Sequence, residues 1–392
     1  MTLVNIATVV DLDVEVPDPI SGTWLGDIKS AASAAVLRDR LAERFPVLAD
    51  GKSRRLAILG AADEGRRLAA IAENIGIEVV AIADDNPNRL STIVGDLKVS
   101  STSDLSLLDA DVPVIIASHR PLQSVQRLRE MGFETVTMFA TLQVLAPDRF
   151  PPHMFYDGWL EDLSDNVGEY ERLMERLDET SQAHLQAILG FRQTMEIGAI
   201  APVIDWAVYE PKGLLSFDDK EVYVDAGTFD GDSIRLFIDR MGEKFERVIG
   251  FEPDPKTYAA LKENFLAEKR VECVNKGLYD RSGTMQFVND ASRGAILGEN
   301  GCVTVDITSL DEHVGADRIS FIKMNIEGAE LEALKGAENV IGTWKPKLAI
   351  SAYHRPSDLW KVPALILNLN ESYELAIRQH DAGVIETVAY AF

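Results

Sequence analysis

The chain has 392 residues, of which 46% are hydrophobic and 26% are charged, the composition of a folded globular protein. This length favours two or three domains. Its 63 acidic and 39 basic residues give a formal net charge of −24. That charge argues against a nucleic-acid partner and against an anionic membrane surface, because both need clustered Lys and Arg.

The two cysteines, Cys273 and Cys302, are too few for a disulfide framework or for a zinc site with four thiolates. We expect free thiols in a reducing compartment. No apolar run reaches the ~18 residues that a membrane-spanning helix needs, and residues 1–16 lack the basic start of a signal peptide. These features predict a cytoplasmic protein without a membrane partner.

Residues 1–53 are expected to form an N-terminal extension with one helix near Ile28–Arg44. Strands and helices alternate from residue 54 onward, which predicts a Rossmann-like domain over residues 54–150 with a parallel sheet covered on both faces. The expected strands are Arg55–Leu59, Glu78–Ala83, Val112–Ala117 and Thr135–Phe139, and the expected helices are Glu64–Asn74 and Leu122–Met131.

The first turn of this domain has Gly60 and Gly65, but Ala62 stands where a dinucleotide-binding turn has its middle glycine. Asp84 and its neighbour end the second strand, where a ribose acceptor would lie. Two interpretations stay open: a scaffold without a ligand, or a site for a nucleotide or nucleotide-sugar. The loop at residues 119–121, His-Arg-Pro, is the feature here that is suited to an anion.

Residues 151–220 are expected to form an acidic helical connector. Apolar residues recur at three- and four-residue steps from Trp159 to Leu177, which is typical of a helix. The chain has 15 acidic and 5 basic residues between Asp157 and Glu221, which indicates a solvated face. An interaction surface is the alternative, and the connector offers a possible interface for a homo-oligomer.

A second α/β domain is predicted over residues 221–392. Its expected strands are Val222–Asp225, Val248–Glu252, Val271–Asn275, Met285–Val288, Ile319–Asn325 and Lys347–Ser351, followed by a terminal antiparallel hairpin of Tyr373–Arg378 and Glu386–Tyr390. The predicted fold class is therefore α/β, with two Rossmann-like parallel-sheet domains joined by a helical connector.

The first strand of this domain runs into VDAGTFDGDS, residues 224–233, and then into an apolar helix. A strand, a glycine-rich turn and a helix in this order form a ligand site at the carboxyl edge of a parallel sheet. Asp225, Asp230 and Asp232 would repel a pyrophosphate, and the turn fits neither common phosphate-binding pattern. An acidic glycine-rich turn is better suited to a cationic ligand.

The next strand ends in GFEPDP, where Glu252 can accept both hydroxyl groups of a ribose. Asp254 then reads as the N-cap of the following helix, with Pro255 as its first residue. A turn that tolerates a cation and a ribose acceptor one strand later together describe S-adenosylmethionine. The alternative is a degenerate nucleotide fold that binds no ligand.

Several motifs in one order give a resemblance to a known family. They are VDAGTFDGDS, GFEP, NKGL (275–278), ITSLDEH (307–313), FIKMNIEGAELEALKGA (321–337), AISAYHRPSDLWKVP (349–363) and ETVAYA (386–391). Over roughly residues 180–392 the chain resembles the FkbM-type family of S-adenosylmethionine-dependent methyltransferases.

The resemblance implies a class I methyltransferase sheet with a reversed last strand, and methyl transfer to a hydroxyl group of a sugar, polyketide or similar metabolite. One position departs from the pattern, because Asn325 stands where the family usually has Asp. A role that needs a negative charge there is therefore in question.

The candidate residues fall into two groups. Those expected to bind the methyl donor are Asp225, Gly227, Thr228, Phe229, Asp230, Gly231, Ser233, Glu252, Pro253 and Asn275. Those expected on the acceptor side are Lys323, Asn325, Glu327 and His354.

Lys323 lies among apolar residues at a strand end, so it needs a partner. It can form a buried ion pair, with Glu327 as the candidate, or contact the substrate or the donor's carboxylate. His354 is a candidate base, because its ordinary pKa is about 6.5. No metal is predicted, because Asn325 and Glu327 lack a third ligand.

These observations predict a cytoplasmic O-methyltransferase that uses S-adenosylmethionine and a carbohydrate or small-molecule acceptor: a sugar, a glycan precursor or a secondary metabolite. One alternative is an NAD-linked oxidoreductase or a nucleotide-sugar-binding protein that uses residues 54–140. Another is a non-catalytic module that binds the methyl donor without turnover.

Overall fold

A computed structural model describes residues 24–49, 53–288, 296–297, 303–383 and 385–392. The predictions made for Cys302 and for residues 1–16 lie outside these ranges. Within the ranges, the structure contains no helix long and apolar enough to cross a membrane.

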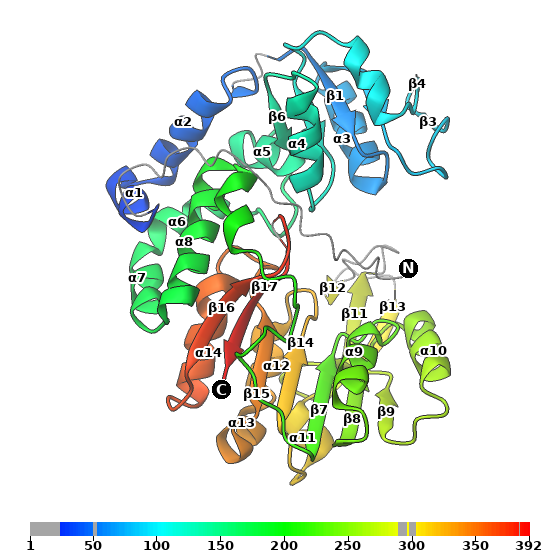
Figure 1. The fold of residues 1–392 in the computed structure, drawn as a ribbon, viewed down its shortest axis with the longest axis vertical. Coiled ribbons are helices and arrows are strands. Elements are labelled where there is room, and N and C mark those ends of the chain that lie inside the picture. The colour runs from blue at the N-terminus through cyan, green and yellow to red at the C-terminus, as the bar shows by residue number, and fades with distance from the viewer. Residues whose placement is uncertain (1–23, 50–52, 289–295, 298–302, 384) are drawn as a thin grey trace.

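The first sheet has four parallel strands in the order β2-β1-β5-β6, as the alternating pattern predicts (Figure 1). These are β1 (Arg55–Leu59), β2 (Glu78–Ala83), β5 (Val114–Ile116) and β6 (Val136–Met138), with helices α3 (Asp63–Asn74), α4 (Leu122–Glu130) and α5 (Phe139–Leu145) and the 3-10 helix η2 (Thr102–Leu107). The inner strands are buried on both faces, so they are continuous apolar runs in the sequence. A short hairpin, β3 (Ile93–Val94) and β4 (Leu97–Lys98), was not predicted.

The N-terminal extension forms two helices, so the prediction of a single helix over Ile28–Arg44 is wrong. Helix α1 (Trp24–Ala31) ends where Ala32 adopts φ +61, and Ser33 then caps α2 (Ala34–Arg44) by accepting the amide of Val36. Both helices pack against the connector helices.

The connector forms three helices, α6 (Trp159–Asp165), α7 (Val167–Glu175) and α8 (Glu179–Thr194), followed by the 3-10 turns η3 (Ile197–Ala199) and η4 (Ala201–Val203). Part of its acidic face contacts basic residues of the N-terminal helices: Glu171 pairs with Lys29 at 2.7 Å and Glu161 with Arg38 at 2.7 Å. This face is therefore a contact within the chain as well as a solvated surface. A homo-oligomer stays a prediction.

The second sheet has seven strands in the order β16-β17-β15-β14-β7-β8-β9. They are β7 (Glu221–Ala226), β8 (Phe245–Phe251), β9 (Val271–Val274), β14 (Phe321–Met324), β15 (Lys347–Ser351), β16 (Leu375–Gln379) and β17 (Thr387–Ala391). The last strand, β17, runs antiparallel to both of its neighbours, and the other pairs are parallel. The helices of this half of the chain are α9 (Asp232–Met241), α10 (Pro255–Asn264), α11 (Leu310–Val314), α12 (Glu330–Lys335), α13 (Glu338–Trp344) and α14 (Asp358–Leu369).

Each face of this sheet has its own apolar layer. Along β7, Val222 and Val224 belong to a core that continues through the connector to the first sheet, whereas Tyr223 packs with Phe237 and Phe321 on the opposite face. This alternation follows the two-residue period of a strand.

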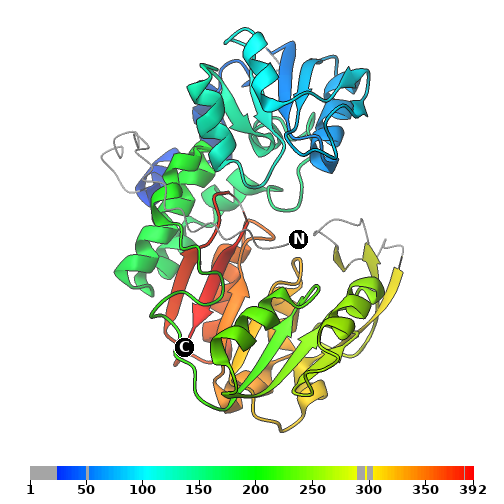
Figure 2. The same ribbon diagram turned by 45° about the vertical axis from the view of Figure 1, so that its right-hand side comes forward.

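One predicted strand lies in another sheet. Met285–Val288 belongs to β11 (Gly283–Val288), which pairs with β12 (Ile296–Leu297) and β13 (Val303–Thr308), and β13 also pairs with β10 (Gly277–Leu278). This small sheet stands beside the main one (Figure 2). Strand propensity predicts that the residues are extended but does not say which sheet they join.

Candidate functional site

The turn after β7 passes very close to neighbouring segments. Gly227 has φ +74, and a Cβ atom there would lie 1.9 Å from the backbone oxygen of Asn325. Gly231 has φ +87, and its Cβ atom would lie 2.2 Å from the ring of Phe265. Both glycines are therefore required sterically. Phe229, between them, also has a positive φ of +52, and its side chain is exposed.

Glu252 follows β8 and faces this turn. Its Oε2 accepts the backbone amide of Phe229 at 3.0 Å, and its Oε1 accepts that of Asp254 at 2.9 Å. Burial raises the pKa of Glu252 to about 7, against the effect of these two donors. Asn275 fixes the end of β8, because its Nδ2 donates to the backbone oxygens of Glu252 and Pro253 at 2.8 and 3.1 Å. The carboxylate is held in place, and each oxygen keeps a lone pair for a further donor.

The structure corrects the expected partner of Lys323. Its Nζ lies 2.8 Å from Oδ1 of Asp225, not against Glu327, and also donates to the backbone oxygens of Ala226 and Gly227 at 3.3 and 2.9 Å. The register of β14 on β7 places Lys323 opposite Asp225. Ser233 donates to the second oxygen of Asp225. Asp225, Ser233 and Lys323 thus form a buried polar cluster beneath the turn.

Two further residues of the turn, Asp230 and Thr228, differ in whether their side chains have partners within the chain. Asp230 forms an ion pair with Arg235 at 2.9 Å. Arg235 therefore competes with a cationic ligand for the Asp230 carboxylate. Thr228 is completely buried, and among the described residues its Oγ1 has no hydrogen-bond partner. Buried hydroxyl groups are rarely left in that state.

At the end of β14, Asn325 lies between two tyrosines. Its Nδ2 donates to the hydroxyl oxygen of Tyr209 at 2.9 Å, and the hydroxyl of Tyr353 donates to its Oδ1 at 3.3 Å. An aspartate has no amide donor and cannot form the first bond. The amide therefore has a structural role that the family's usual carboxylate would not fill in the same way.

His354 follows β15 and is completely buried. Its Nδ1 lies 3.0 Å from Oε1 of Glu330, and its Nε2 lies 3.5 Å from Oε2 of Glu327. Burial acts to lower the pKa of His354, but these carboxylates outweigh it and raise the pKa to about 9. The imidazole is therefore protonated at neutral pH, with a carboxylate at each nitrogen.

This geometry does not support the prediction that His354 is the general base, because a protonated imidazole has no free lone pair. Glu327 is better placed for that role. Burial raises its pKa to about 7, against the charge of His354, and a general base is most effective with a pKa near the working pH. Its backbone adopts φ +55.

Residues from the first half of the chain reach this edge of the sheet. The ring of Phe155 lies 5.9 Å, between centroids, from the rings of both Tyr353 and His354. Arg120 forms an ion pair with Asp381, in the turn between β16 and β17. The loop that was predicted to contact an anion thus contacts a carboxylate of this chain.

Residues at the predicted nucleotide position in the first sheet form contacts within the chain. Oδ2 of Asp84 accepts the backbone amide of Ala61 at 2.8 Å and lies 3.2 Å from Arg89. At Gly65, a Cβ atom would lie 1.8 Å from the oxygen of Gly60, so this glycine serves close packing of α3 on β1. A nucleotide at this site stays a prediction.

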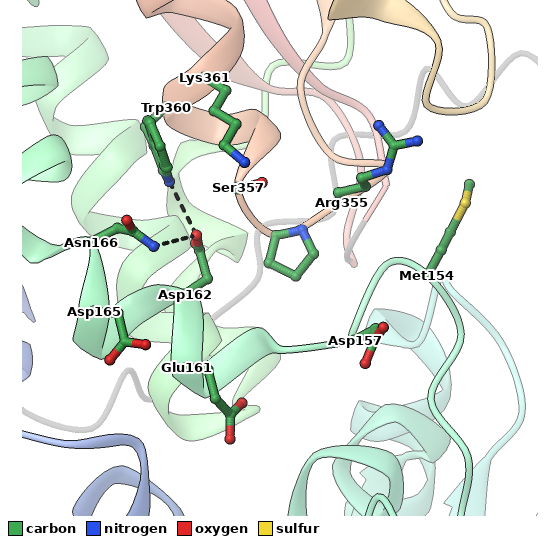
Figure 3. Close-up of a pocket in the computed structure, with 11 residues that line it drawn as sticks. Met154, Asp157, Glu161, Asp162, Asp165, Asn166, Arg355, Ser357, Trp360 and Lys361 are labelled. Atoms are coloured by element: carbon green, nitrogen blue, oxygen red, sulfur yellow. Dashed lines mark hydrogen bonds between the residues drawn. The ribbon is translucent and has the colours of Figure 1, made fainter.

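A groove of about 480 Å³ lies between α6 and the start of α14 (Figure 3). Figure 3 shows Arg355 and Met154 on one side of it and Trp360 and Asn166 on the other. Arg355 connects the groove to the site, because its guanidinium carbon would lie 3.5 Å from a Cβ atom at Gly328, the residue after Glu327.

Sequence reasoning missed several residues at this site, notably Tyr209, Tyr353, Glu330 and Arg120. Tyr353 and Glu330 stand inside the quoted motifs, so proximity to His354 and Glu327 was an available signal. Tyr209 and Arg120 lie far away in the sequence. No local pattern indicates Tyr209, and the loop of Arg120 is predicted to contact an anion at the first sheet, not at this site. Among the described residues, no group of three or more His, Cys, Asp or Glu side chains is arranged to hold a metal ion.

The chain is similar to known methyltransferases. A family model for the methyltransferase FkbM domain matches residues 225–381. The hexuronic acid methyltransferase AglP of Haloferax volcanii is 30% identical over 150 residues, which cover 34% of this chain and 63% of AglP. The chain thus spans less than two thirds of the length of that relative.

The crystal structure of the methyltransferase FkbM from Methylobacillus flagellatus KT matches with a TM-score of 0.74 at 28% identity, covering 94% of this chain and 99% of that chain. A match of this extent includes the N-terminal sheet and the connector as well as the seven-stranded sheet. Residues 225–381 therefore form an FkbM-type methyltransferase domain, and the chain resembles that crystal structure over most of its length.

Proposed function

We propose that this protein transfers a methyl group from S-adenosylmethionine to a hydroxyl group of a sugar. The observation that carries the donor assignment is the pairing of the glycine turn with Glu252. Gly227 and Gly231 let the turn pass directly against Asn325 and Phe265, where a Cβ atom would clash, and Glu252 is fixed beside this turn with lone pairs available for two hydroxyl donors. The unpartnered Oγ1 of Thr228 adds a buried polar atom that a ligand can satisfy.

The donor's sulfonium supplies an electrophilic methyl group, so the leaving sulfur needs no acid catalysis. The protein has to place the acceptor hydroxyl and receive its proton. Glu327 is the proposed base. Its Oε2 lies 3.5 Å from Nε2 of His354, which helps to fix the position of the carboxylate. Lys323 acts indirectly, because its ion pair with Asp225 fixes the strand end from which the turn starts.

The proposal of a sugar acceptor rests on the family and on the hexuronic acid methyltransferase AglP. A uronic acid has a carboxylate beside its hydroxyl groups. Arg355 is exposed next to the Glu327 segment and, among the described residues, forms no ion pair. A guanidinium group binds a carboxylate through two parallel hydrogen bonds, so Arg355 is the proposed partner of an acidic acceptor.

Calorimetry with S-adenosylmethionine tests the donor assignment. We expect Glu252→Ala to lower donor affinity at least about tenfold, since hydrogen bonds to a charged group contribute about 1.5–3 kcal/mol. Glu246→Ala is the matched control, because Glu246 lies on the same strand but is exposed. If the wild-type protein fails to bind the donor at millimolar concentration, the proposed function is wrong.

Methyl transfer is tested with isotopically labelled donor and three acceptors: D-glucuronic acid, D-galacturonic acid and D-glucose. We expect labelled O-methyl product from a uronic acid at a higher rate than from glucose. Donor binding without transfer to any sugar, alone or within a glycan, would refute the sugar assignment and leave the donor assignment intact.

A further inference from the structure

Glu386 lies at the carboxyl edge of the seven-stranded sheet, although it comes almost at the end of the chain. Strand β17 runs antiparallel, so its first residue lies beside the last residues of β15, and Ala352 donates its amide to the carbonyl of Thr387 at 2.9 Å. Burial, and then the negative charge of Glu386, raise the pKa values of both Tyr209 and Tyr353. Glu386 therefore faces the tyrosines that hold Asn325.

The side chain of Glu386 has an unusual set of contacts. Its Oε2 is buried and has no hydrogen-bond partner among the described residues. Glu330 and Asp358 nearby also have one such oxygen each, but their other oxygen accepts the amide of Ile326 or of Arg355 at 2.8 Å. The other oxygen of Glu386 has instead a contact with Arg120 at 3.9 Å. Glu386 also adopts φ +65, a left-handed backbone conformation that is strained for a non-glycine residue.

The cation nearest to this carboxylate comes from the first sheet. Nη2 of Arg120 lies 3.9 Å from Oε1 of Glu386, and Nε of the same guanidinium pairs with Asp381. The loop that carries Arg120 is pressed against the β16–β17 turn, because a Cβ atom at Gly383 would lie 1.7 Å from the oxygen of His119. Figure 2 shows this turn, in red, extending from the sheet toward the N-terminal half.

We propose that Oε2 of Glu386 accepts a hydrogen bond from a hydroxyl group of the acceptor, and that Arg120 is the positioning residue that holds this carboxylate in place. The N-terminal sheet thus completes the acceptor site of the methyltransferase domain. This inference rests on the proposed function, because it assigns a residue to the same acceptor. Glu386 binds the acceptor and Glu327 receives its proton.

Several charged and titratable groups surround Glu386. Burial raises the pKa of Glu386, and Asp381 adds to this effect, whereas Arg120, Lys323 and His354 act against it. Burial and the charge of Glu386 in turn raise the pKa values of Glu327, Tyr209, Tyr353 and Tyr390. Lys323 and His354 are each committed to a carboxylate at 2.8–3.0 Å. Arg120 is the cation in this set that contacts both Asp381 and Glu386 from the first sheet. Its removal therefore changes the charge next to Glu386, while the ion pairs of Lys323 and His354 remain.

The test compares steady-state kinetics of the full-length wild-type protein, Glu386→Gln, Arg120→Ala and Arg120→Lys with the best of the three acceptors. Glu386→Gln should raise the KM for the sugar about fivefold, because a neutral amide oxygen accepts a weaker hydrogen bond than a carboxylate oxygen. The affinity for the methyl donor, measured by calorimetry, should not change. Arg120→Ala should move the acidic limb of the kcat/KM profile to higher pH by about 0.5 to 1 unit. The shift is this small because Arg120 is half-exposed, and solvent screens its charge.

Arg120→Lys should restore most of the wild-type profile, because it keeps the charge. Arg127→Ala is the control, since Arg127 forms an exposed ion pair with Asp85 on the same sheet, away from the contact. An unchanged acceptor KM in Glu386→Gln, or equal pH profiles in Arg120→Ala and Arg127→Ala, would overturn this inference while the proposed function stands. A wild-type protein that binds no donor would overturn both.

Discussion

The ion pair between Lys323 and Asp225 gives the sharpest test of the site's structural basis. Lys323→Met removes the cation but keeps most of the side-chain volume. It leaves a completely buried carboxylate without its cation, with the hydroxyl groups of Ser233 and Tyr223 as side-chain partners, and the carbonyls of Ala226 and Gly227 each lose a donor. Breaking one partner out of a buried pair costs about 3–5 kcal/mol, because an uncompensated charge stays in the interior.

We therefore expect Lys323→Met to lower the free energy of unfolding by about 3–5 kcal/mol. Adding Asp225→Asn should recover about 2 kcal/mol, because the double variant no longer buries a lone charge. Urea unfolding followed by tryptophan fluorescence and by circular dichroism measures both values, and coincident transitions license the conversion to free energy.

A loss below about 1 kcal/mol in Lys323→Met would refute the reasoning, since that is the range of exposed pairs. The reasoning would also be refuted if the double variant lost as much unfolding free energy as Lys323→Met and Asp225→Asn lose in total when measured singly. If Lys323 instead contacts the donor's carboxylate, the variant keeps its stability and loses donor affinity, a result that calorimetry would separate.

Two other predictions follow from the same geometry. Gly227→Ala should lower donor affinity at least about tenfold, because its Cβ atom would overlap the oxygen of Asn325, whereas Gly213→Ala, with a similar φ of +79 and open space around it, should incur only the backbone cost of about 1–2 kcal/mol and leave donor affinity unchanged. The pKa of His354 is raised to about 9 from 6.5, so the stability it contributes is complete below about pH 6.5 and disappears as the pH rises through 9. The stability difference between wild type and His354→Gln, measured by urea unfolding, should therefore shrink from pH 6.5 to pH 9.5, and a constant difference would contradict the ion-pair assignment.

The sequence predicts those parts of the fold that depend on local pattern. Strands Glu78–Ala83 and Lys347–Ser351 have the predicted bounds, because each is an apolar run between turn residues. The glycines of the Gly227–Gly231 turn and the acid after β8 were likewise predicted from their order along the chain. A strand, a turn and a helix in sequence place their own residues at the sheet edge without further information.

Contacts between distant segments could not be predicted in this way. Lys323 and Asp225 are 98 positions apart, and their pairing depends on β14 lying next to β7 in register. Alternation shows that Lys323 is buried but does not identify its partner. His354 was expected to be a base from its residue type alone, and the two carboxylates that keep it charged come from a different strand end.

The connector covers an edge of the methyltransferase sheet. Strand β16 is an edge strand, yet every residue in it is buried, because α8 packs on it and Leu177 and Ile204 form isolated bridges to it. His184 accepts the amide of Gln379 at 3.1 Å, which satisfies a donor on that edge. Without the connector, this strand would expose apolar side chains and unpaired amides, the features that drive edge-to-edge aggregation.

A fragment of residues 214–392 should therefore aggregate or unfold without cooperativity, although it contains all seven strands of the sheet. A fragment of residues 157–392 keeps α6 to α8 and should remain soluble, with a cooperative transition by circular dichroism and measurable donor binding. If the shorter fragment folds cooperatively and binds the donor as tightly as the full chain, the methyltransferase domain is independent of the connector. In that case the burial of β16 has no part in its stability.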